Sequence, residues 1–379
     1  MHTSSTGRRR RFRTAAAAAA GLLTTAIMVP TTGAATPTTA DPAAVSAAAS
    51  PGIEVIRTGL NSPKGLDSIL GLPVMGQGAF GPPAPVVGVL PRWGGGTQLT
   101  DISTPVSMVD IAIAPDLAVW GIGADLQLYR KGPQSRSFTK VLDIPAYQAT
   151  DPDPNNAEGE PTESNPYGLA ILPNGHALIA DAANNDVLRV TPRGNVVTVA
   201  RFGTEQVATD HLPAEMGLPP TMTTEAVPTS IAVTPEGILV GELKGFPFRP
   251  GSSRIWRIDP NATGAVCSVD PPATPRGARP ACAEYASGFT AIADLAVDVW
   301  TKKLYVYQLA ADGVLAFEGG FETGEFPPAV LTEVRPNGQR RELAAGQLFQ
   351  PGGVEVTIFG QVLATDGMFG DGRLVRVRT

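Results

Sequence analysis

The stretch Gly168-Leu169-Ala170-Ile171 decides the fold, because its strand-like pattern recurs along the chain. Five further copies begin at Gly65, Asp110, Ser230, Asp294 and Gly353, of which the first is the most degenerate. Successive copies lie about 45 to 64 residues apart, which matches the ~40–50-residue period of propeller repeats once loop insertions are allowed. Six copies of a four-stranded unit at this spacing predict an all-β fold, a six-bladed β-propeller around a central channel.

The third unit shows the four strands of a blade most clearly. Its apolar and β-branched runs lie at Gly168–Leu172, Ala177–Ala180, Val187–Val190 and Asn195–Ala200. The turns between them contain Asn-Gly and Arg-Gly pairs, which are typical of hairpin corners. In the fifth unit the same division predicts the third strand at Val314–Phe317 and the outer strand near Arg340–Ala344.

The last unit is one strand short, because the chain stops soon after its third strand, Leu374–Val377. At the other end of the repeat region, Ile53–Arg57 resembles the outer strands of the other units. We therefore predict that these two segments pair and close the ring, which removes the open sheet edges that invite aggregation. The first blade is the least clear. Its stretch from Leu70 to Asp101 is rich in Gly and Pro, and Val86–Leu90 is its best strand candidate.

The N-terminal residues have the pattern of an export signal. Arginines between Arg8 and Arg13 precede the apolar, alanine-rich run Ala15–Val29, which is too short for a typical membrane anchor, and small residues follow. We predict a signal peptide over residues 1–35, a flexible leader over 36–52 and one propeller domain over 53–379. Arg9-Arg10-Arg11-Phe12 fits a twin-arginine signal in part, so that route and the general secretory route both stay open.

Charge and composition limit the partners of the folded domain. A net charge of −6 gives no electrostatic support to nonspecific nucleic-acid binding. The 42 glycines and 36 prolines lie between short apolar runs and therefore indicate turns rather than disorder. No stretch after the signal is suited to cross a membrane. We expect a secreted or cell-envelope monomer whose partner is a small molecule, a glycan or a protein.

The chain has two cysteines, Cys267 and Cys282, which flank a segment rich in Pro and Arg. Exported proteins seldom keep free thiols, so we predict a disulfide between them. A cysteine nucleophile is then excluded.

Three motifs resemble the ScyD/ScyE family of exported proteins from actinobacteria and cyanobacteria. They are Asn165-Pro166-Tyr167-Gly168-Leu169-Ala170, the string Gly241-Glu242-Leu243-Lys244-Gly245-Phe246-Pro247-Phe248, and Gly288-Phe289-Thr290. The resemblance covers most of residues 53–379 and is strongest from 163 to 297. It implies a six-bladed propeller related to NHL-repeat proteins. Cyanobacterial members are associated with making or exporting the pigment scytonemin, but the resemblance implies no general activity.

One face of the ring is expected to carry the functional site. In a propeller with strands A to D from the channel outward, the D-to-A and B-to-C connections share one face. Three long segments lie there, Asp151–Glu163, Gly203–Val227 and Leu243–Ser253, all around the third and fourth blades. Long loops on a rigid scaffold usually carry function, so we predict a binding site on this face and at the adjoining channel mouth.

The first of these segments holds the carboxylates of Asp151, Asp153, Glu158, Glu160 and Glu163. Hard oxygen ligands of this kind suit Ca²⁺ or another divalent cation. The spacing fits no EF-hand pattern, however, and interspersed prolines favour an extended, solvated loop.

Two phenylalanines, Phe246 and Phe248, follow strand B of the fourth blade. They are suited to stack on an aromatic or apolar ligand, and equally to fill a groove between blades.

A polar side chain recurs at the end of strand B, as Asp181, Glu242, Gln308 and Asp366. Together these groups are candidates to bind a cation or polarise a substrate. The alternative is local, because each is also placed to accept backbone N–H groups in its own turn.

Asp110 and Asp294 begin strand A in blades two and five, which stand opposite each other in a ring of six. They are a candidate clamp for a cation or a substrate across the channel. Alternatively, each hydrogen-bonds neighbouring backbone.

The function classes that remain are three. Only His2, His176 and His211 are present, so a His-based metal site or a Ser-His-Asp triad has almost no material. Binding without catalysis is favoured, because no acid–base pair follows from the spacing. The alternatives are a lactonase or esterase with a carboxylate-bound divalent cation, and an assembly factor for an exported metabolite. Convergence of the channel and strand-B carboxylates on one point would favour the hydrolase.

Overall fold

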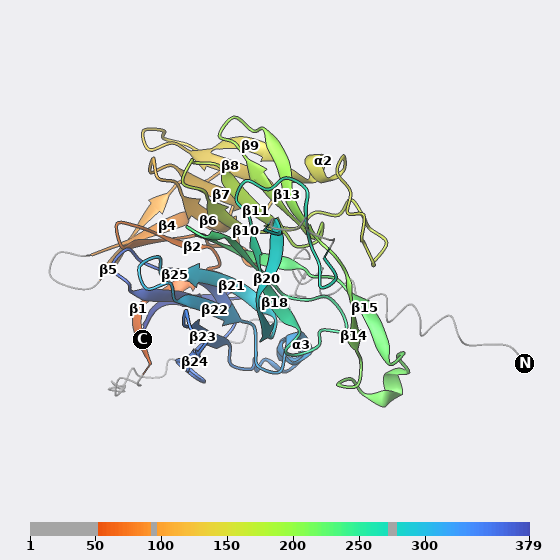
Figure 1. Ribbon diagram of the computed structural model, residues 1–379. Coiled ribbons are helices and arrows are strands. Elements are labelled where there is room, and N and C mark those ends of the chain that lie inside the picture. Colours follow the sequence, from red (N-terminus) through yellow and green to blue (C-terminus); the bar gives the residue numbers. More distant parts are fainter. Residues whose placement is uncertain (1–51, 92–96, 272–278) are drawn as a thin grey trace, which may run out of the picture.

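The computed structural model describes residues 52–91, 97–271 and 279–379. The predicted signal peptide and nearly all of the predicted leader lie outside these residues. Six antiparallel sheets are arranged as the blades of a β-propeller (Figure 1), as the repeat predicts.

Each blade has four strands, ordered from the channel outward. Blade one comprises β2 (Leu66–Ile69), β3 (Leu72–Met75), β4 (Val86–Pro91) and β5 (Thr97–Ile102). Blade two comprises β6 (Met108–Ile113), β7 (Val119–Gly123), β8 (Gln127–Lys131) and β9 (Thr139–Asp143). Blade three comprises β10 (Pro166–Ile171), β11 (Ala177–Asp181), β12 (Asp186–Val190) and β13 (Val196–Phe202), with β19 (Ala265–Cys267) added outside in parallel.

The second half of the ring follows the same plan. Blade four comprises β16 (Pro228–Thr234), β17 (Gly237–Glu242), β18 (Ser253–Ile258) and β20 (Cys282–Phe289). Blade five comprises β21 (Ile292–Val297), β22 (Leu304–Gln308), β23 (Val330–Val334) and β24 (Arg340–Leu343). Blade six comprises β25 (Pro351–Val356), β26 (Val362–Asp366), β27 (Asp371–Val377) and β1 (Ile53–Asn61).

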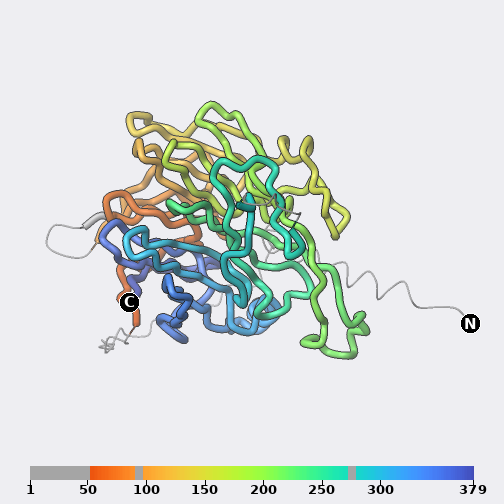
Figure 2. The backbone as a smooth tube through the Cα atoms, viewed as in Figure 1, coloured from red at the N-terminus to blue at the C-terminus, as the bar shows by residue number. Residues whose placement is uncertain are grey.

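The ring is closed as predicted, by strands from the two ends of the folded domain. β1 pairs antiparallel with β27, with Ile53 opposite Val377 and Arg57 opposite Leu374. In Figure 2 the red N-terminal strand accordingly lies beside the blue C-terminal end. β4 also confirms the strand expected at Val86–Leu90 in the first blade.

The prediction for the fifth blade was wrong at one strand. Residues Val314–Thr323 form a helix, α3, and the third strand is β23. Val314, Phe317 and Gly320 are buried at a three-residue spacing, which is helical rather than alternating. A Cβ on Gly320 would lie 2.5 Å from the ring of Phe326, so only glycine lets that ring pack against the helix. The strand was predicted on four residues, which are too few to distinguish the two-residue period of a strand from the 3.6-residue period of a helix.

The apolar core is divided among the gaps between blades. β11 illustrates why, because all its side chains are buried and successive ones face opposite ways. Ala177 and Ile179 pack toward blade two, whereas Leu178 and Ala180 pack toward blade four. Each blade is therefore apolar on both faces, which accounts for the continuous apolar runs of the inner strands.

The predicted disulfide is present between Cys267 and Cys282, whose Cα atoms are 5.2 Å apart. Cys267 ends β19, which pairs with β13 of blade three, and Cys282 begins β20, the outer strand of blade four. The bridge therefore connects the outer edges of two adjacent blades.

The two faces of the ring differ in their connections. The loop face carries α2 (Ile144–Gln148), α3 and the hairpin of β14 (Glu205–Ala208) and β15 (Thr221–Thr224). The opposite face, here called the turn face, carries the A-to-B and C-to-D turns and the C terminus. In Figure 1, α2 and the hairpin lie on the right and the C terminus lies on the left. Within the described residues no helix is long and apolar enough to cross a membrane.

Candidate functional site

The recurrent residues at the ends of the B strands are each held within their own blade connections. Asp181 is fully buried at the end of β11. Its Oδ1 accepts the N–H groups of Asn165 at 2.7 Å and Asn184 at 3.2 Å. Its Oδ2 accepts from Ser164 Oγ at 2.7 Å and from Gln148 Nε2 at 3.1 Å. The carboxylate thus fastens the B-to-C turn of blade three to the segment that enters the blade.

Glu242 is equally buried and has a similar role in blade four. It accepts the N–H of Arg254 at 2.8 Å and the indole N–H of Trp256 at 3.0 Å. Lys244 Nζ lies 3.0 Å from Glu242 Oε1 and 2.7 Å from Glu205 Oε1. Burial raises the pKa of Glu242, and Lys244 opposes that rise.

The two remaining members of this set are also bound locally. Gln308 Oε1 accepts the N–H of Thr290 at 2.8 Å. Asp366 receives two donors of Arg373, with Nε 2.9 Å from Oδ1 and Nη2 2.8 Å from Oδ2. The structure therefore does not bring these four side chains together at one point.

Asp110 and Asp294 lie half-buried on the channel wall, where they connect blades. Asp110 Oδ2 accepts the N–H of Leu169 in blade three at 2.8 Å, and its Oδ1 accepts the adjacent Ile111 N–H. Asp294 Oδ2 accepts the N–H of Val354 in blade six at 2.8 Å. The inner edge of every A strand has no further strand to pair with. Its backbone N–H groups therefore need other acceptors, and these carboxylates supply some of them.

Sequence reasoning missed two further channel carboxylates, Asp67 and Glu355. Asp67 Oδ2 accepts the N–H of Ile113 in blade two at 2.6 Å, and Glu355 Oε1 accepts from Ser68 Oγ at 2.8 Å. Both occupy the third position of the recurrent phrase, where the other four copies have alanine. An alignment of the six copies at that position was the available signal.

Burial governs the titration of these channel groups. It raises the pKa of Asp67 to about 7, and burial together with the charge of Asp110 raises the pKa of Asp294 to about 7. Lys64 opposes this shift in both Asp110 and Asp294. Its Nζ donates to the Tyr167 carbonyl at 2.8 Å and lies 3.8 Å from the centre of the Tyr167 ring.

Phe246 and Phe248 belong to an apolar cluster on the loop face. Their ring centroids are 5.6 Å apart at right angles, and Phe248 is buried. The cluster draws on the B-to-C connections of four blades, with the phenylalanines Phe80, Phe246, Phe248, Phe317, Phe326 and Phe369. Met368 belongs to it as well, and the Tyr167 hydroxyl donates to its Sδ at 3.7 Å. Phe246 and Phe248 therefore pack against other apolar side chains of the protein.

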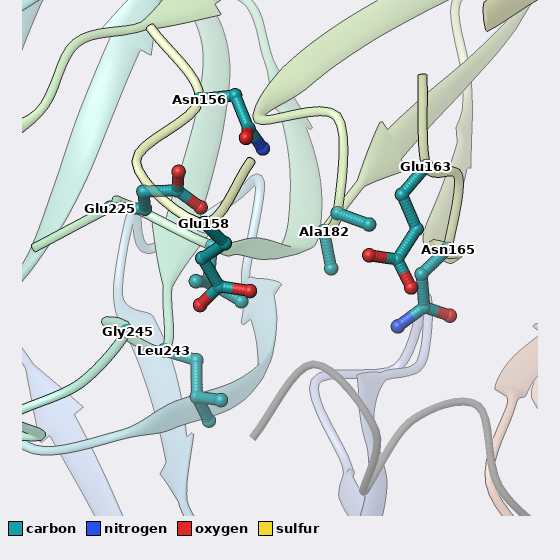
Figure 3. Close-up of a pocket in the computed structure, with 10 residues that line it drawn as sticks. Asn156, Glu158, Glu163, Asn165, Ala182, Glu225, Leu243 and Gly245 are labelled. Atoms are coloured by element: carbon teal, nitrogen blue, oxygen red, sulfur yellow. The ribbon is translucent and has the colours of Figure 1, made fainter. Parts of the chain in front are cut away.

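An acidic pocket opens on the loop face over blades three and four, within the face predicted to bind. Its carboxylates are Glu158 and Glu163 from the long segment before β10, and Glu225 from the segment before β16 (Figure 3). The remaining lining residues are Asn156, Asn165, Ala182, Ala183, Val227, Leu243 and Gly245.

Asn185 holds these segments together beneath the pocket. Its Nδ2 donates to Asp153 Oδ2 at 3.2 Å and to Glu225 Oε2 at 3.0 Å. Its Oδ1 accepts the N–H of Val227 at 2.9 Å. Asn185 has a φ of 50°, a left-handed conformation that asparagine adopts more readily than most residues. Glu225 also accepts the N–H of Ala157, which anchors the acidic segment over blade four.

The pocket is lined by three acidic side chains and by no basic one. Glu158 is exposed at the mouth of the pocket, yet partial desolvation by the surrounding protein, followed by repulsion from Glu225 and Glu163, raises its pKa to about 7. Burial also raises the pKa values of Glu163 and Glu225. None of the lining residues is basic. Lys244, in the connection that borders the pocket, is already engaged by Glu205 and Glu242.

One buried donor faces the pocket without a partner. Asn165 is 3% exposed, and its Nδ2 has no hydrogen-bond partner among the described residues. Figure 3 shows this nitrogen directed toward the pocket interior. The space open to a water-sized sphere is about 10 Å³, enough for about one water molecule. An unpaired buried donor is costly, so a group that accepts from Asn165 is expected there.

The carboxylates are not grouped as a metal site. Over residues 52–91, 97–271 and 279–379, no three His, Cys, Asp or Glu side chains are placed to hold one ion. The long acidic segment itself divides, because Asp151 pairs with Arg201 whereas Glu158 and Glu163 face the pocket.

Comparison with known proteins identifies the fold and no family. No protein-family model and no curated protein sequence matches the chain. Among solved structures, a glucose dehydrogenase is 14% identical with a TM-score of 0.52, covering 87% of this chain and 100% of its own. A PQQ-bound aldose sugar dehydrogenase from Streptomyces coelicolor is 14% identical with a TM-score of 0.50, covering 86% and 98%. A virginiamycin B lyase from Staphylococcus aureus is 13% identical with a TM-score of 0.48, covering 85% and 98%. At these identities the likeness shows the six-bladed fold alone.

Proposed function

We propose that this chain is an exported binding propeller that holds a primary ammonium group of its ligand in the pocket formed by Glu158, Glu163 and Glu225. The observation that carries the proposal is a pocket with space for about one water molecule, which three carboxylates line and to which no basic residue contributes. An ammonium head is close to water in size, and its charge would relieve the repulsion among the carboxylates.

Asn165 refines the ligand class. Its unpaired Nδ2 is a donor, and an ammonium group offers only donors in return. A ligand with an oxygen next to its amine would satisfy both sides, with the amine on the carboxylates and the oxygen on Asn165. Amino alcohols and amino sugars have this arrangement, so they are the small molecules or glycan units that fit best.

Export and family remain part of the proposal. The N-terminal pattern of residues 1–35 and the disulfide between Cys267 and Cys282 both support release into an oxidising compartment. The resemblance to the ScyD/ScyE family supports an exported propeller, and an assembly role for an exported metabolite is compatible with amine binding.

Binding is favoured over a metal-dependent lactonase or esterase. Asp181, Glu242 and Asp366 are each bound by donors of their own blade, and Asp110 and Asp294 bridge neighbouring strands. Such dispersed carboxylates have few lone pairs left for a shared cation. CaCl₂ serves as the cation control, because Ca²⁺ prefers carboxylate and amide oxygens although no three carboxylates of the described residues are placed to hold one ion.

The experiment is a melting-temperature screen with matched pairs of probes, followed by calorimetry. Glucosamine and ethanolamine are compared with glucose and ethylene glycol, and CaCl₂ is included. We expect the amines to raise the melting temperature in a saturable way and the neutral partners to have no effect. A shift with CaCl₂ alone would replace the ammonium by a cation site, and no shift with any probe would overturn the proposal.

Variants locate the effect. Glu158→Gln and Glu225→Gln remove pocket charges and are expected to abolish the amine response. Glu160→Gln is the matched control, because it removes a charge from the same segment without altering the pocket lining. An amine response that survives in both pocket variants would place the binding elsewhere.

A further inference from the structure

Exposed apolar side chains are gathered at the A-to-B turns of four consecutive blades on the turn face. Trp300 of blade five is 78% exposed, Phe359 of blade six 72% and Leu70 of blade one 70%. Leu117 of blade two, at the same turn, is also exposed. The chain orders these turns side by side, because blades five, six, one and two follow one another around the ring. The corresponding turns of blades three and four carry Asn174-Gly175 and Pro235-Glu236 instead.

Folding does not account for these residues. Leu70 and Leu117 have φ values of 51° and 64°, in the left-handed region where a Cβ is unfavourable. Blade three places Gly175 at a φ of 81° in its own A-to-B turn, and Gly or Asn is the ordinary solution. A leucine at such a position costs stability and buries little apolar surface.

Leu70, Leu117, Trp300 and Phe359 are here called the apolar tips. Two of them have contacts with neighbouring residues. The ring of Phe359 lies against the turn of blade one, where a Cβ on Gly71 would be 2.7 Å from it. Asp298 accepts the N–H groups of Trp300 at 2.9 Å and Thr301 at 3.1 Å, which fixes the turn below the indole. Neighbouring residues therefore hold the Phe359 ring and the turn of Trp300 in place.

Basic side chains accompany the tips. Arg136, Arg193 and Arg378 lie at the outer turns and the C-terminal end on this face, are exposed, and form no ion pair among the described residues. Of the acidic residues in the A-to-B turns, Asp116 pairs with Arg130 at 2.7 Å and Glu236 pairs with Lys302. Asp298 forms no ion pair among the described residues and accepts backbone N–H groups instead. The turn face thus presents the apolar tips together with three arginines that lack an ion pair. An exposed acidic residue without an ion pair among the described residues, Asp259, lies in the C-to-D turn of blade four.

We propose that the turn face docks on the surface of an anionic lipid bilayer, with the four apolar tips inserted at the headgroup level. The chain as a whole has a net charge of −6, so the attraction has to be local to this face. Arg136, Arg193 and Arg378 favour an anionic surface, because each nearby arginine is attracted to acidic headgroups. The tips are separated by polar turn residues, so a protein partner would need several matched pits, whereas a fluid bilayer admits each tip independently. Tryptophan, as at position 300, favours this interface.

The proposal is independent of the ligand that the acidic pocket binds. It predicts an orientation, because the loop face is opposite the turn face and would point away from the bilayer. The pocket over blades three and four would then stay open to the aqueous phase.

The test is co-sedimentation of the full chain with vesicles of phosphatidylcholine alone and of an equal mixture with phosphatidylglycerol. We expect binding to the mixed vesicles that weakens as salt is added. Because residues 15–29 are themselves apolar, the decisive comparison is between variants of the same length. Leu70→Asn/Leu117→Asn keeps the turn conformation and should weaken binding by roughly tenfold or more, since two inserted tips are lost. Trp300→Ser should act in the same direction.

Tyr285→Ser is the matched control, because Tyr285 is an exposed large side chain on the outer strand of blade four. It should bind as the unaltered chain does. Brominated lipid should quench a tryptophan signal that is absent from Trp300→Phe. Equal binding of the control and the double leucine variant, or no binding to any vesicle, would overturn the proposal. A concentration-dependent dimer abolished by the leucine variant would assign the face to a second copy of the chain instead.

Discussion

Asp110 Oδ2 accepts the backbone N–H of Leu169 across 2.8 Å, and so joins the inner strand of blade two to that of blade three. Asp67 makes the same connection from blade one to blade two, and Asp294 from blade five to blade six. These carboxylates occupy the place where a propeller has unpaired strand edges facing its channel. They therefore stabilise the ring by joining neighbouring inner strands.

Replacing Asp110 by Ala should lower the free energy of unfolding by about 1–3 kcal/mol, because two backbone N–H groups at the channel wall lose their acceptor. Asp110→Asn keeps one acceptor oxygen and should cost less. Urea unfolding of the two variants measures the difference. A variant Asp110→Ala as stable as the unaltered chain would contradict the bridging role.

The channel carboxyls should make stability fall as the pH rises from about 4 to about 7. Asp67 and Asp294 have pKa values raised from 3.8 to about 7, so the folded state binds their protons more tightly than the unfolded state. Their stabilising contribution is complete below the unfolded pKa and is lost as the pH passes through the folded pKa. Urea unfolding across this range, compared with Asp67→Asn/Asp294→Asn, isolates the effect. Parallel pH profiles for the two proteins would contradict it.

Removal of residues 53–58 should make the protein insoluble or domain-swapped. The deletion takes away most of β1 and leaves the edge of β27 open to pairing with another chain. Size-exclusion chromatography of the soluble fraction measures the outcome, with a deletion of residues 36–50 as the control. A soluble, folded monomer without residues 53–58 would show that the strand is dispensable for closure.

Loss of the disulfide should destabilise the fold by about 3 kcal/mol, because the bridge closes a loop with a sequence separation of 15. Cys267→Ser/Cys282→Ser is compared with the unaltered chain in urea, with and without reductant. Reductant should lower the stability of the unaltered chain alone. Identical stability of both proteins in the absence of reductant would contradict a structural role for the bridge.

The acidic pocket could be predicted from the sequence only in part. The carboxylates of residues 151–163 and the face on which they lie follow from the blade pattern, because loop placement depends only on strand order. The pocket itself does not follow. It needs Glu225, about sixty residues farther along, and the unpaired Nδ2 of Asn165. Which members of an acidic run turn inward depends on contacts such as the bridge from Asn185 to Asp153 and Glu225.

The amino-acid sequence alone determined the blade number, the pairing of Ile53–Arg57 with Leu374–Val377, and the disulfide. The first two follow from the strand pattern, because alternation identifies a strand wherever it lies. The disulfide follows because the chain has only two cysteines. The tertiary structure decided that residues after Val314 form a helix, because packing of Phe326 on Gly320 selects it. It also decided that Asp67 and Glu355 join Asp110 and Asp294 at the channel wall, and that exposed apolar side chains of four blades share the turn face. Ring closure brings together side chains from separate blades, and no local pattern records which of them meet.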